Sequence, residues 1–124
     1  MSTKRKPALD VSERLREVVA AAQDRKALDL RVLHVDEISD FTEYFLICSG
    51  ASDRQVQAIA EAVQETLRDD GVRPSGVEGY RHGSWVLIDY GDFVVHIFDQ
   101  GIRSYYGLER LWADGSDVTD SFLQ

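Results

Sequence analysis

Apolar residues recur at the spacing of one helix face in three stretches of the chain. These stretches are residues 11–26, 53–70 and 103–112. The first follows Asp10, and Glu13 three positions later has the spacing of a capping box. Ser52 or Asp53 can serve as N-cap of the second stretch, and Gly71 is suited to end it. The pattern therefore predicts three helices, of which the third is short.

Between these helices the apolar pattern changes to that of β-strands. Five segments fit: residues 28–35, 44–48, 77–79, 85–90 and 93–98. The second of them is a short continuous apolar run, which is typical of a buried central strand. Helices and strands in this order predict an α/β (α+β) domain, with a mixed sheet of about five strands flanked by helices.

The last two strands are predicted to form a β-hairpin with Gly91 and Asp92 in its turn. Counting outward from the turn places Trp85 opposite Phe98 and separates two faces of different composition. The core face carries Val86, Ile88, Tyr90, Phe93, Val95 and Ile97. The mixed face carries Trp85, Leu87, Asp89, Val94, His96 and Phe98. Because aromatic anchors are enriched in protein interfaces, the mixed face is a candidate for partner binding.

The pattern leaves two alternatives open for the mixed face. Aromatic residues in strands are also common in cores, so Trp85 and Phe98 could be buried beneath a helix. Asp89 and His96 occupy diagonal positions, where they could form a structural hydrogen bond or belong to an interface.

Composition and length are those of one globular domain. Of the 124 residues, 44% are hydrophobic and 29% are charged. We expect a disordered basic tail over residues 1–9, a single domain over 10–113 and a frayed C-terminal tail over 114–124. No apolar run approaches the roughly 20 residues of a membrane span, and the first residues lack the apolar middle of a signal peptide. A cytoplasmic protein that does not associate with membranes is expected.

The charge distribution bears on possible partners. The formal net charge is −8, although Lys4, Arg5 and Lys6 lie within the first seven residues, so the remainder is more acidic still. An acidic surface repels phosphate backbones, so little or no direct nucleic-acid binding is expected. A basic protein partner would be attracted, although acidity is also an ordinary means of staying soluble.

The residues offer little for catalysis. Gly50-Ala51-Ser52 at a helix N-terminus could hold a phosphate, which makes a nucleotidyltransferase-like enzyme the main alternative to a binding protein. Two-metal phosphoryl transfer needs clustered carboxylates, commonly at positions i and i+2 of a strand, and no two acids in this chain have that spacing. The single cysteine and three histidines show no metal-ligand spacing. We therefore predict no catalytic, cofactor or metal residues and no enzymatic activity.

Between about residue 27 and residue 112 the chain carries an ordered set of short motifs: residues 40–45 (DFTEYF), 50–55 (GASDRQ), 58–60 (AIA), 78–79 (EG), 85–92 (WVLIDYGD), 95–98 (VHIF), and Arg103, Tyr106, Leu108, Glu109, Leu111 and Trp112. In the order and spacing of these motifs the chain resembles the ribosomal silencing factor family, also called the Iojap-like family. Two departures are Glu43, where the family more often has Asp, and the Gln100-Gly101-Ile102 link.

The resemblance implies a fold like that of nucleotidyltransferases without their catalytic carboxylates. Family members bind ribosomal protein L-fourteen on the large ribosomal subunit and sterically block the small subunit. They are thought to repress translation in starvation or stationary phase, and isolated members tend to be homodimers. On this basis the expected partner-binding residues are Trp85, Asp89, Tyr90, Asp92, His96 and Phe98.

Overall fold

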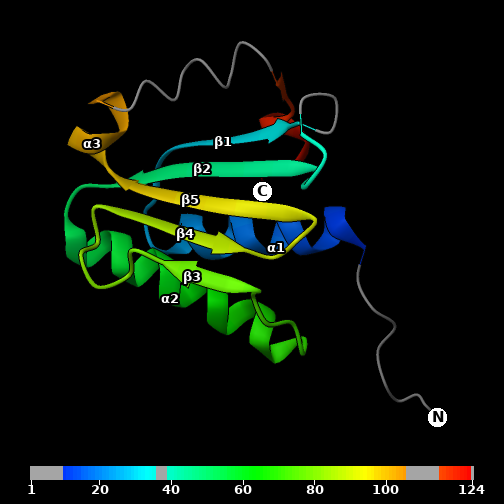
Figure 1. Cartoon of the computed structure of the whole chain (residues 1–124), viewed down its shortest axis with the longest axis horizontal. Coiled ribbons are helices and arrows are strands. Elements are labelled where there is room, and N and C mark those ends of the chain that lie inside the picture. Colours follow the sequence, from blue (N-terminus) through cyan, green and yellow to red (C-terminus); the bar gives the residue numbers. More distant parts are fainter. Residues whose placement is uncertain (1–9, 36–38, 106–114, 124) are drawn as a thin grey trace.

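A six-stranded mixed sheet forms the centre of the computed structural model, which describes residues 10–35, 39–105 and 115–123 (Figure 1). Its strands are β1 (Leu28–His34), β2 (Tyr44–Gly50), β3 (Gly76–Glu78), β4 (Trp85–Asp89), β5 (Phe93–Asp99) and β6 (Ser116–Asp117). Their order across the sheet is β3-β4-β5-β2-β1-β6. Strands β2 and β5 are parallel, and the other neighbouring pairs are antiparallel. The predicted fold class is confirmed, with β6 as an additional strand.

The described residues form four helices, of which the first two begin where the sequence places their caps. They are α1 (Val11–Asp24), α2 (Asp53–Asp69), α3 (Gln100–Tyr105) and the 3-10 helix η1 (Thr119–Ser121). The Asp10 carboxylate accepts the Glu13 amide hydrogen at 2.9 Å, and Glu13 reciprocates, which completes the capping box. Ser52 is the N-cap residue of α2, because its hydroxyl accepts the Gln55 amide hydrogen at 3.2 Å. No helix in the described part of the chain is long and apolar enough to cross a membrane.

Helices α1 and α2 lie together on one face of the sheet (Figure 1). Their apolar stripes pack against the core face of the hairpin and against inward-facing residues of β1 and β2. This core includes Leu15, Val18, Val32, Leu46, Val56, Ile59, Val63, Val86, Ile88, Phe93, Val95 and Ile97. Burial of this continuous apolar set is the main source of stability of the domain.

The hairpin has the predicted register. Trp85 lies opposite Phe98, and the pairing continues to Asp89 opposite Val94. Gly91 adopts a φ of 87°, a conformation that favours glycine, and its amide donates to the Asp89 carboxylate at 2.8 Å. The turn chemistry and the alternation of side chains therefore act together to set the faces of β4 and β5.

Two segments differ from the sequence-based expectation. The third helix begins at Gln100 rather than Arg103, and the Asp99 carboxylate accepts the Gly101 amide hydrogen at 3.0 Å at its start. Its predicted continuation to residue 112 extends beyond the described residues, as does the predicted tail over residues 1–9.

The C-terminal segment is not frayed over residues 116–122, contrary to expectation. Strand β6 pairs with the outer edge of β1, and the Thr119 hydroxyl accepts the Val32 amide hydrogen at 2.9 Å. Phe122 is buried and joins the core beneath the sheet. The gain from burying this aromatic ring explains why the segment is held in place.

Candidate functional site

The mixed face lies on the side of the sheet opposite α1 and α2. Its residues do not share one environment: Trp85, Leu87, Asp89 and Val94 are partly exposed. His96 and Phe98 are buried. Among the described residues, α3 is the only helix that packs on this side, through Ile102 near the end of β5. A partner can therefore reach only part of the mixed face.

Trp85 is held in a defined orientation on this face. Its ring stacks on Phe98, with centroids 4.8 Å apart and planes inclined at 30°. Its indole Nε1–H donates to Nδ1 of His96 at 3.3 Å. Because Nδ1 acts as the acceptor, the proton of the neutral imidazole resides on Nε2. An aromatic side chain held by both stacking and a hydrogen bond loses little conformational freedom when it meets a partner.

His96 supports Trp85 from within the sheet. Burial lowers the pKa of His96 from 6.5 to about 4, so its ring is neutral near pH 7. The Phe45 ring meets the imidazole edge to face at a centroid distance of 5.0 Å. The sequence places His96 among the partner contacts, but with only 8% of its surface exposed it lies beneath the accessible part of the mixed face.

Phe98 belongs to a second buried cluster. It packs with Leu33, Val35 and Ile47, and all four side chains are fully buried. The sequence places Phe98 among the partner contacts, but in this structure it supports the Trp85 ring from below. The side of the sheet that faces away from α1 and α2 therefore has a buried apolar layer of its own.

The residues around the turn point in different directions. The Asp89 carboxylate accepts the Gly91 amide hydrogen, whereas His96 bonds to Trp85, so the structure does not pair Asp89 with His96. Tyr90 packs against Phe93 on the core side, and burial raises the pKa of its hydroxyl to about 12. Asp89 and the exposed Asp92 are therefore the turn residues that accompany the mixed face.

The loop over residues 39–43 lies next to the hairpin turn. The alternation of side chains along β4 and β5 does not predict this neighbour. The main-chain carbonyl of Asp92 accepts amide hydrogens from Glu43 at 2.9 Å and Tyr44 at 3.2 Å. These bonds tie the hairpin turn to residues 39–43, where Phe41 is 92% exposed. The DFTEYF segment that contributes to the family resemblance was the only sequence signal for this loop.

Two amide donors at the N-terminus of α2 are occupied by side chains of the same turn. The Ala51 amide donates to the Gln55 side-chain oxygen at 2.6 Å, and the Gln55 amide is capped by Ser52. A Cβ atom at Gly50 would lie 2.9 Å from the Val56 amide nitrogen, so the chain itself fills the space beside this turn. Because these donors are already satisfied, the arrangement gives no support to nucleotide binding here.

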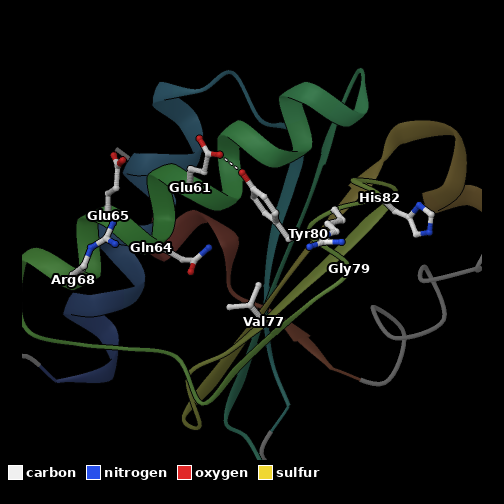
Figure 2. Close-up of a pocket in the computed structure, with 9 residues that line it drawn as sticks. Glu61, Gln64, Glu65, Arg68, Val77, Gly79, Tyr80 and His82 are labelled. Atoms are coloured by element: carbon white, nitrogen blue, oxygen red, sulfur yellow. Dashed lines mark hydrogen bonds between the residues drawn. The ribbon is translucent and has the colours of Figure 1, made fainter.

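An open groove of about 680 Å³ lies between α2 and β3 with its following loop (Figure 2). It is lined by Glu61, Gln64, Glu65, Arg68, Val77, Gly79, Tyr80, Arg81 and His82. Across it the Tyr80 hydroxyl donates to the Glu61 carboxylate, and this bond raises the pKa of Tyr80. The described residues contain no group of three or more potential metal ligands. The lining side chains form a polar surface groove.

Comparisons with known proteins agree with the resemblance seen in the sequence. The family model described as "Ribosomal silencing factor during starvation" matches residues 8–124. A ribosomal silencing factor of Bacillus subtilis is 45% identical over 100 residues, covering 81% of this chain and 85% of its own length. Another, from Halalkalibacterium halodurans, is 43% identical over 106 residues, covering 86% of this chain and 91% of its own.

The fold agrees as well. A crystal structure of a Chromobacterium violaceum protein matches with a TM-score of 0.81 at 35% sequence identity, covering 85% of this chain and 88% of that protein. The same mixed sheet and flanking helices therefore accompany the sequence similarity. Since the family model spans nearly the whole chain, this protein belongs to the ribosomal silencing factor family.

Proposed function

We propose that this protein binds the large ribosomal subunit through ribosomal protein L-fourteen and sterically blocks association with the small subunit. Translation would then be repressed during starvation or stationary phase. The observation that carries this proposal is the match of the silencing-factor family model over residues 8–124. The protein acts in the cytoplasm, and it is a homodimer when free.

The contact surface that we propose is the exposed part of the mixed face together with the hairpin turn. Trp85 provides a rigid aromatic anchor, supported by His96 and Phe98. Asp89 and Asp92 add negative charge at the hairpin-turn end of the same surface, which suits a basic ribosomal protein. Blocking a subunit interface requires only bulk at that interface, so the affinity can come from one compact patch.

The action is non-enzymatic and needs neither a cofactor nor a metal. The alternative of a nucleotidyltransferase-like enzyme would need a phosphate site and clustered carboxylates. The donors at the start of α2 are used by Gln55 and Ser52, and no two acids have i, i+2 spacing. These features favour a binding protein.

The two functions differ in their stoichiometry. Purified protein added to separated subunits should reduce subunit joining in a sucrose gradient at near-stoichiometric amounts and without added nucleotide. Co-sedimentation with isolated large subunits, but not with small subunits, should accompany this effect. Substoichiometric inhibition that depends on a nucleoside triphosphate would overturn the binding mechanism.

A further inference from the structure

Phe41 is exposed to a degree that folding alone does not explain. Its side chain is 92% exposed, whereas the other exposed large hydrophobic residues in the described chain are less than half exposed: Leu28 at 38%, Val77 at 37% and Leu123 at 43%. Single apolar residues on a surface are common, but a nearly fully solvated aromatic ring contributes little to folding. Whether Phe41 can contact a partner therefore depends on how its backbone is held and on which charged residues lie in the same loop.

The backbone that carries Phe41 is held on both sides. The Ser39 hydroxyl accepts amide hydrogens from Phe41 at 3.2 Å and from Thr42 at 3.3 Å. The Ser39 amide in turn donates to the Val35 carbonyl at 2.9 Å. On the other side Glu43 bonds to the hairpin turn through the Asp92 carbonyl. The ring is thus presented on an ordered support, which reduces the entropy lost on binding.

This loop lies at the hairpin-turn end of the sheet (Figure 1). The residue pair that follows it along β2 and β5, Phe45 beside Val94, belongs to the same side of the sheet as Trp85. A partner seated on the mixed face and reaching past Asp92 would therefore come to the loop that carries Phe41.

The surroundings of the ring are acidic. Asp40 and Asp92 are exposed, and Glu43 is partly exposed and lies 3.6 Å from His34. An exposed aromatic ring on a loop with acidic residues complements a basic protein surface, since the ring can enter an apolar depression while the acids meet its cationic rim. A second copy of this chain would bring like charges together at the same place.

We propose that Phe41 is a second aromatic anchor for the basic ribosomal partner, at the hairpin-turn end of a contact surface whose other end is Trp85 at the start of β4. This proposal rests on the proposed function and adds to it a contact outside the hairpin. It commits the binding surface to the mixed face of β4 and β5, the turn between them and the loop over residues 39–43. Because the ring is solvated in the free protein, its removal acts on binding and not on folding.

The test compares Phe41→Ala with the unchanged protein in quantitative co-sedimentation with isolated large subunits. We expect binding to weaken by about ten-fold or more, as for an interface anchor, with an unchanged unfolding temperature. Val77→Ala is the matched control, because Val77 is an exposed apolar residue on the edge strand β3, and its binding should stay at the unchanged level. Ser39→Ala, which removes the hydroxyl acceptor but keeps the ring, should weaken binding by a few-fold.

Several outcomes would overturn the proposal. Equal binding by Phe41→Ala and the unchanged protein would remove Phe41 from the contact surface while leaving the proposed function intact. A shift from dimer to monomer without a change in large-subunit binding would assign the ring to the contact between copies. A lower unfolding temperature would contradict its solvated placement. Failure of the unchanged protein to bind large subunits would defeat the proposed function itself, and this inference with it.

Discussion

The core face and the mixed face of the hairpin come from the same two strands, yet they meet different requirements. The core face is apolar apart from the partly buried Tyr90, and α1 and α2 cover it. The mixed face combines a buried layer, Phe98 and His96, with partly exposed residues such as Trp85. A hydrogen bond within the face, from Trp85 to His96, orients the partly exposed aromatic ring. The comparison teaches that incomplete burial of an oriented aromatic residue marks the face suited to recognition.

The largest expected effect comes from opening the core face. Ile97→Ala removes a fully buried side chain beneath the helices, so the free energy of unfolding should fall by about 2–5 kcal/mol. Urea unfolding followed by circular dichroism measures the loss. Leu87→Ala on the mixed face, where the side chain is partly exposed, should cost clearly less. Equal losses from both substitutions would show that the two faces are buried alike.

A pH series tests whether the buried imidazole of His96 makes the free energy of unfolding depend on pH. The pKa of His96 is about 4 in the folded chain against 6.5 without burial, so the unfolded chain binds the proton more readily between these values. The free energy of unfolding should therefore decline as the pH falls from 6.5, with a contribution from His96 of about 3 kcal/mol by pH 4.

The matched variant for this series is His96→Phe, which keeps a ring at the position but cannot titrate. Subtracting its denaturation curve at each pH removes the contribution of the carboxylates that both proteins share. The difference between the two proteins should change steeply between pH 6.5 and pH 4. A constant difference over this range would indicate that the His96 ring is solvated in the folded protein.

Trp85→Ala tests whether the mixed face is the recognition surface. Large-subunit binding should weaken by more than about 2 kcal/mol, because a central aromatic anchor is lost. Thermal unfolding is to be recorded on the same sample, since the ring also packs on Phe98. A folded variant that binds normally would exclude this face as the contact surface, whereas an unfolded one would assign Trp85 to the core.

Trp85→Phe separates the ring from its hydrogen bond. Phenylalanine retains the stacking surface but has no N–H to donate to His96. Binding should be intermediate between those of the unchanged protein and Trp85→Ala. Equal binding by Trp85→Phe and the unchanged protein would mean that the bond to His96 does not contribute to orienting the anchor.

The smallest effect is expected from charge at the rim. Asp92→Asn should weaken large-subunit binding by less than about 1 kcal/mol, mainly through a slower association rate at low salt. Association rates measured at two salt concentrations test this, and the deficit should nearly vanish at the higher one. A deficit that is independent of salt would place Asp92 within the buried part of the contact.

Local chemistry explains the parts of the fold that the sequence predicts well. The caps at Asp10 and Ser52 depend on residues three positions away, and the hairpin register depends on Gly91 and its flanking residues. Each of these features is encoded within a few consecutive residues. The alternation of side chains then assigns the residues of β4 and β5 to faces before any tertiary contact is known.

The candidate site was predicted only in part. Trp85, Asp89 and Asp92 are accessible as the sequence suggests, whereas Phe98 and His96 are buried and Tyr90 packs toward the core side. Membership of a face follows from alternation, but the exposure of a residue on that face depends on what packs over it. Nothing in the hairpin sequence states which segments do so.

The sequence by itself determined the first two helices, the principal strands, the hairpin register and the family of this protein. Tertiary structure alone decided the parallel pairing of β2 with β5, the addition of β6 to β1 and the burial of Phe98 beside Leu33 and Val35. These contacts join segments that are far apart along the chain. Their stability comes from burying apolar surface supplied by several elements at once, a quantity that no single segment specifies.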